Sequence, residues 1–102
     1  MIVYISIGNS DDKLSQAEWA NFVREVEEEI DSRTVGVHGR WFSSPRSPFQ
    51  NACWCIELDH VKAAWIRREL ARLARVYRQD SIAWAEAPAT EFISPEAGDD
   101  GR

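Results

Sequence analysis

The stretch IVYISIGNSDDKLSQAEWANFVREVEEEIDS (residues 2–32) contains a strand pattern followed by a helix pattern. Apolar and polar residues alternate over 2–7, which is typical of a strand with one buried face. Turn-forming residues at 8–12 end this strand. The residues SQAE at 15–18 predict a capping box, and the apolar residues that follow recur at helical spacing to about Ser32.

The rest of the chain continues this alternation of strands and helices. Residues 34–42 and 52–58 are each predicted to form a strand, and the loop at 43–51 between them is rich in proline and serine. Apolar residues at helical spacing predict a second helix over 60–78. A last strand is predicted over 81–85.

The resulting order, β-α-β-β-α-β, is the split βαβ pattern of ferredoxin-like folds. We therefore predict an α+β domain with a four-stranded antiparallel sheet and both helices on one face. Right-handed crossovers give the strand order 4-1-3-2. Residues 1–93 are expected to form this single domain, and residues 94–102 a flexible acidic tail.

The strand predicted over 34–42 is central to any functional interpretation, because it carries the most suggestive side chains. The alternation favours Val35, Val37 and Trp41 on the buried face, with His38 and Arg40 on the open face. A slip of one residue would reverse these assignments. The open face is then expected to carry Tyr4, Ser6, His38, Arg40, Phe42, Cys53, Cys55 and Glu57.

Composition excludes several classes of protein. The chain has 102 residues, enough for one domain, and its 44% hydrophobic content argues against global disorder. No apolar run is long enough to span a membrane, and residues 1–7 have no export-signal pattern. The net charge of −5 disfavours non-specific nucleic-acid binding. A cytoplasmic location is therefore expected, without a membrane partner.

The charges are unevenly distributed along the chain. Residues 15–33 contain six acids and two bases, whereas residues 62–78 contain six bases and one acid. One interpretation is attraction between these segments, within a subunit or between subunits. The other is an anion-binding site on the basic segment.

Two cysteines, Cys53 and Cys55, lie on the same face of their predicted strand. Their spacing does not suit a relaxed disulfide, and two ligands would leave a zinc site incomplete. We interpret them as reduced structural thiols, with a reactive pair as the alternative. The sequence shows no other metal-ligand cluster and no cofactor motif, so neither a metal nor a cofactor is expected.

The candidate ligand-binding residues are His38, Arg40, Trp41, Arg46 and Phe49. Arginine offers bidentate contacts to phosphate or carboxylate, and histidine adds a donor. Aromatic rings beside them could stack on a nucleobase. The alternative is a solvated or interface-paired His38 and Arg40, with the aromatic residues closing one end of the core.

Several blocks of sequence resemble a small uncharacterised protein family of phages and mobile elements of high-GC Gram-positive bacteria. These blocks are YISIGNSDD (4–12), HGRWFS (38–43), QNACWC (50–55) and YRQDSIAW (77–84). The resemblance carries over no activity and no site residues. It implies phage–host functions, including sequestration of nucleotide immune signals by small phage-encoded proteins.

These observations lead to one functional hypothesis and two alternatives. We expect a small non-enzymatic binding protein, a homo-oligomer and most simply a dimer, that sequesters a small anionic or nucleotide-like ligand. The first alternative is a protein–protein interaction module that uses the open sheet face or edge to bind a host or phage protein. The second is a metal-dependent nuclease, although the sequence shows no metal cluster for it.

Overall fold

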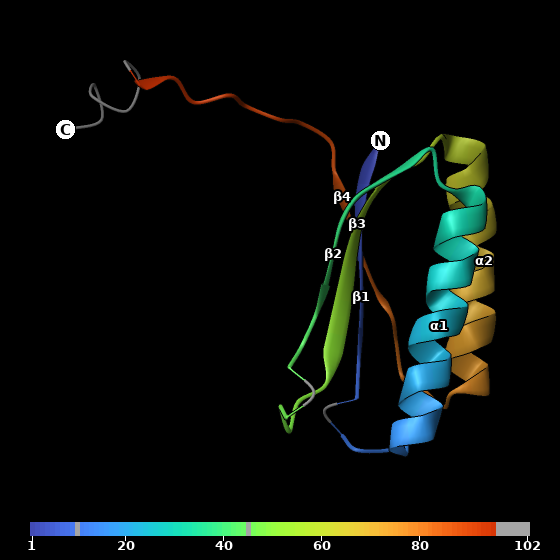
Figure 1. Ribbon diagram of the computed structural model, residues 1–102. Coiled ribbons are helices and arrows are strands. Elements are labelled where there is room, and N and C mark those ends of the chain that lie inside the picture. The colour runs from blue at the N-terminus through green and yellow to red at the C-terminus, as the bar shows by residue number, and fades with distance from the viewer. Residues whose placement is uncertain (10, 45, 96–102) are drawn as a thin grey trace.

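The computed structural model describes residues 1–9, 11–44 and 46–95 and contains one sheet covered on one face by two helices (Figure 1). The elements, in chain order, are β1 (Ile2–Gly8), α1 (Gln16–Arg33), β2 (Gly36–Phe42), β3 (Asn51–Glu57), α2 (His60–Val76) and β4 (Ala83–Ala87). The sheet order is β2-β3-β1-β4 and every pairing is antiparallel. The α+β ferredoxin-like prediction is confirmed.

Side-chain caps start both helices. At α1, the Ser15 hydroxyl accepts a hydrogen bond from the Glu18 amide at 3.1 Å, and the Glu18 carboxylate accepts one from the Ser15 amide at 3.0 Å. This is the predicted capping box, which satisfies two amides that have no partner within the helix. At α2, the Asp59 carboxylate accepts from the Lys62 amide at 2.7 Å. The helix ends at Val76, just before Arg78, which has φ of 56°.

The core lies between the sheet and the two helices. The register places Ile5 of β1 between Trp54 of β3 and Trp84 of β4. Ile5 and Trp54 are fully buried, as is Phe22 of α1. The predicted buried faces of β1, β3 and both helices are confirmed by these positions and by the rest of the core, Val3, Ile7, Leu14, Val26, Ile30, Ala52, Ile56, Leu58, Ala63, Ile66, Leu70 and Leu73.

A β-bulge in β2 corrects the predicted faces of this strand. Val37 lies opposite Ile56, but Gly39 rather than His38 lies opposite Cys55. The extra residue reverses which face of the sheet each later side chain of β2 points to. Arg40 is therefore opposite Trp54 on the helix side, and Trp41 is opposite Cys53 on the open face.

Phe42 is corrected in the same way, because its ring meets the ring of Trp54 edge-on, with centroids 5.9 Å apart. Strand β4 also begins later than predicted, at Ala83 rather than Ser81. Residues 88–95 then extend away from the domain on the side opposite the helices (Figure 1). Of the predicted tail, residues 96–102 lie outside the described residues.

Candidate functional site

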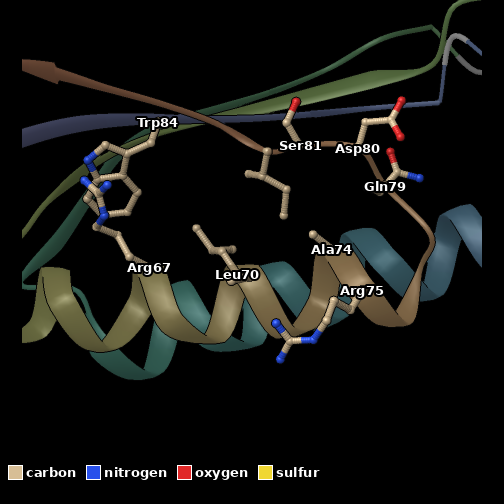
Figure 2. A pocket seen from close by; sticks show the side chains of 10 residues that line it. Arg67, Leu70, Ala74, Arg75, Gln79, Asp80, Ser81 and Trp84 are labelled. Carbon is tan, nitrogen blue, oxygen red and sulfur yellow. The ribbon is translucent and has the colours of Figure 1, made fainter.

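A groove of about 430 Å³ lies between α2 and β4, on the helix side of the sheet (Figure 2). We call it the α2–β4 groove. Its lining residues are Arg67, Leu70, Ala71, Ala74, Arg75, Gln79, Asp80, Ser81, Ile82 and Trp84. Leu70 and Ala74 form its apolar floor, and polar and charged side chains lie at its two ends. This arrangement, apolar with a few polar groups, is typical of small-molecule sites.

One end of the groove consists of an aromatic ring and a cation. The guanidinium carbon of Arg67 lies 5.1 Å from the centre of a Trp84 ring, and Figure 2 shows the two side chains in contact across the groove. The Trp84 indole donates to Glu86 at 3.2 Å, and Arg67 lies 3.9 Å from the same carboxylate. The long distance to Glu86 leaves the Arg67 charge only weakly compensated.

The other end combines Arg75 with groups from the segment between α2 and β4. Arg75 forms an ion pair with none of the residues that the structure describes. Asp80 is the one acid in the lining, and its carboxylate pairs with the Lys13 ammonium at 3.3 Å. Ser81 adds a hydroxyl to this end. The groove thus has cations near both ends and a single acid that already has a partner.

The pairing of the basic segment explains why these cations remain available. Across the described part of the chain, one ion pair joins residues 62–78 to residues 15–33, between Arg78 and Glu18 at 2.9 Å. Arg72 pairs with Glu69 of its own helix. Attraction between the two segments therefore accounts for one of the bases, and Arg67 and Arg75 border the groove instead.

A second hollow, of about 500 Å³, lies at the other end of α2 around Trp65. The guanidinium carbons of Arg33 and Arg68 lie 4.5 and 5.6 Å from the centre of its ring. Lys62 also borders this hollow. In both hollows an arginine stacks on an indole, and each has a cation with neither an ion pair nor a ring contact among the described residues, Lys62 here and Arg75 in the α2–β4 groove. The α2–β4 groove is the better anion site because the Arg75 guanidinium can contact a phosphate through two nitrogens.

The structure does not bring the predicted site residues together. The His38 imidazole lies 3.0 Å from Glu57 on the open side of the sheet. Arg40 is on the helix side, where it bonds Glu27 at 2.9 Å and lies 3.6 Å from Asp31. The predicted shared face of His38 and Arg40 is therefore wrong, and the bulge between Val37 and Gly39 is the cause.

The remaining predicted residues are exposed. Trp41 lies on the open face of β2, 55% exposed, and Phe49 in the 43–51 loop is 62% exposed. Arg46 is an exposed residue of the same loop, and its backbone amide donates to the Ser44 hydroxyl at 3.2 Å. These three side chains line neither the α2–β4 groove, nor the hollow around Trp65, nor a smaller hollow beside Gly8 and Asp11.

Sequence reasoning missed the α2–β4 groove. It offered an anion-binding site somewhere on residues 62–78 as one of two interpretations, without placing it beside β4. The only available signal was the surplus of bases at 62–78 beside a tryptophan-bearing strand. The groove itself depends on how β4 packs beside α2. The spacing of apolar residues within either element does not indicate this packing.

Within residues 1–9, 11–44 and 46–95, no group of three or more His, Cys, Asp and Glu side chains is placed to hold a metal. No described helix is long and apolar enough to cross a membrane. No protein-family model matches the chain, and no curated protein matches it.

Proposed function

We propose that this protein is a small, non-enzymatic, cytoplasmic binding protein that sequesters a small anionic, nucleotide-like ligand in the α2–β4 groove. The observation that carries this proposal is Arg75, which has no ion pair with the described residues, at one end of an apolar groove whose other end is formed by Trp84 and Arg67. An unpaired guanidinium beside an apolar wall favours an anion with a planar apolar part.

The dimensions of the groove suit a nucleoside monophosphate. Arg67 and Arg75 are two helical turns apart on α2, about 12 Å along the helix axis. A base would stack near Trp84 and Arg67, and its phosphate would lie at the other end, where the Arg75 side chain, which points away from β4 in Figure 2, would turn toward it. Affinity would come from stacking and charge-assisted hydrogen bonds, without any covalent step.

The proposal also includes the dimer expected from the sequence and a role in phage–host conflict. That role rests on the resemblance to phage proteins and takes the form of removing a nucleotide signal from solution. It needs no catalysis, because stoichiometric binding is sufficient.

Isothermal titration with a set of nucleoside monophosphates and the matching nucleosides tests this proposal. We expect Arg75→Gln to weaken binding of a monophosphate at least tenfold and to leave binding of the nucleoside nearly unchanged, since only the phosphate contact is lost. The matched control is Arg46→Gln, an exposed arginine outside the groove, which should bind like the parent. Absence of binding by every monophosphate at millimolar concentration, or an unchanged affinity in Arg75→Gln, would refute the proposal.

A second candidate function, the protein-interaction module, is favoured by a different observation. The sheet face opposite the helices exposes Tyr4 and Trp41, at 45% and 55%. A host or phage protein could bind there. Such a partner would co-purify in fixed ratio with the parent chain and would be lost on Trp41→Lys but retained on Arg75→Gln.

A further inference from the structure

The sheet face opposite the helices, which we call the open face, is uncharged at its centre. The register places Tyr4 between Cys55 of β3 and Ala85 of β4, and Ser6 between Cys53 and Ala83. On this face the strands carry charge only at one end, where His38 lies 3.0 Å from Glu57. The net charge of −5 is therefore located elsewhere on the molecule.

Residues 88–95, which we call the arm, extend from the end of β4 on the same side as the open face (Figure 1). Two adjacent apolar side chains of the arm are almost fully exposed, Phe92 at 93% and Ile93 at 80%. Adjacent large apolar residues with this exposure are unusual on a monomer and typical of a contact surface.

We propose that the open face is covered by the same face of a second copy of this chain, and that each arm crosses the partner. This inference rests on the dimer included in the proposed function and is independent of ligand capture. A face without charge at its centre can meet its own copy without repulsion. A two-fold axis then makes both arm contacts equivalent and closes the assembly at two copies.

The area that a stable dimer buries can be reached only if the open face and the arm both contribute to the interface. Three strands of seven residues and β4 of five residues, about 4.8 Å apart and about 3.3 Å per residue, give a footprint of roughly 400 Å². A stable interface buries about 800 Å² on each partner. The face alone falls short of this, and the arm adds the exposed apolar side chains of Phe92 and Ile93.

The reach of the arm also fits a second copy. Eight extended residues span about 26 Å, and facing sheets lie about 10 Å apart. The arm therefore crosses the inter-sheet gap and continues past the partner's sheet. Phe92 is the fifth residue after β4, so at about 17 Å it has already passed that gap and reaches the partner's sheet edge.

The two cysteines report directly on this interface, since both lie on the open face and the chain has no others. The experiment measures mass by light scattering after gel filtration, and thiol labelling by N-ethylmaleimide with intact-mass readout. Tyr4→Lys places a charge at the centre of the face, where the parent side chain is 45% exposed. Val61→Lys is the matched control, because Val61 is an 81% exposed residue of α2.

We expect the parent and Val61→Lys to be dimers whose thiols label at least tenfold more slowly than those of a monomeric Tyr4→Lys. Phe92→Ser combined with Ile93→Ser should weaken the dimer at least tenfold. A monomeric parent, or a dimer whose thiols label as fast as those of Tyr4→Lys, would overturn the proposal. If Tyr4→Lys is unfolded by circular dichroism, Trp41→Lys at the exposed edge takes its place. Titrating the monomeric variant with nucleotide tests the α2–β4 groove separately from the dimer. Binding by the monomer would show that the ligand site does not depend on this interface.

Discussion

The guanidinium Nη1 of Arg40 donates a hydrogen bond of 2.9 Å to Oε1 of Glu27, beneath the edge strand of the sheet. The same carboxylate oxygen accepts from the indole Nε1 of Trp54 at 3.3 Å. Glu27 of α1 thereby connects β2 and β3 to the helix layer. Arg40 can reach it only because the bulge in β2 turns its side chain toward the helices.

Arg40→Ala is therefore expected to lower the stability of the fold and to leave ligand capture intact. The loss should be about 1 kcal/mol in the free energy of unfolding, the upper range for a partly exposed ion pair. Urea denaturation measures it, with Arg46→Ala as the exposed control that should not shift the midpoint. If Arg40→Ala keeps the parent stability but no longer binds a monophosphate, Arg40 belongs to the ligand site and this prediction is wrong.

Asn9 is a buried side chain, 2% exposed, in the connection between β1 and α1. Its amide nitrogen donates to the Leu14 carbonyl at 3.0 Å and to Gln50 Oε1 at 3.1 Å, and its oxygen accepts from the Leu14 amide at 3.0 Å. Asn9→Ala leaves the Leu14 amide and carbonyl without these partners, whereas Gln50 Oε1 still accepts from Gln16 at 3.3 Å, so we expect a loss of about 2–4 kcal/mol. The control is Asn21→Ala on the exposed side of α1, which should change stability by less than about 0.5 kcal/mol. A small loss in Asn9→Ala would show that water replaces the amide.

Tyr77 is expected to make stability fall at high pH. Burial, together with a hydrogen bond to Glu25, raises the pKa of Tyr77 to about 12. Because the folded-state pKa lies above the ordinary value of about 10, this contribution is complete below pH ~10 and is lost as the pH rises toward 12. The pKa of Tyr4 is also raised, chiefly by a hydrogen bond with the Cys55 thiol, so both single variants are needed. Ultraviolet absorbance of tyrosinate should show a transition near pH 12 that is missing in Tyr77→Phe and retained in Tyr4→Phe. A transition that disappears only with Tyr4→Phe would contradict this assignment.

Glu57 is expected to make the stability of the fold decrease at low pH. The hydrogen bond from His38 lowers the pKa of Glu57, with a further contribution from the Met1 ammonium group 3.4 Å away. Its stabilising contribution is present above the ordinary carboxyl range and is lost as the pH falls through the lowered value. Carbon NMR of the Glu57 carboxyl should show the pKa rising in His38→Ala. His60→Ala, at the start of α2, should leave it unchanged.

The order of elements, the helix starts and most of the core could be predicted from the sequence alone. Alternation in β1 and β3 and helical spacing in α1 and α2 are properties of neighbouring residues, so each stretch reports its own buried face. The capping box at Ser15 and Glu18 is local in the same sense. Six elements in the order β-α-β-β-α-β then leave few topologies to consider.

Tertiary structure decided the faces of β2 and the position of the groove. The alternation of 34–42 contains no mark of the bulge, because an extra residue is accommodated by pairing with β3 and not by its own side-chain pattern. The one extra residue in β2 turns the Arg40 side chain toward Glu27 on the helix side. It also turns Trp41 onto the open face. Similarly, Arg75 and Trp84 share a groove because β4 docks beside α2. Local sequence sets the periodicity of an element, whereas register and docking depend on contacts between residues far apart in the chain.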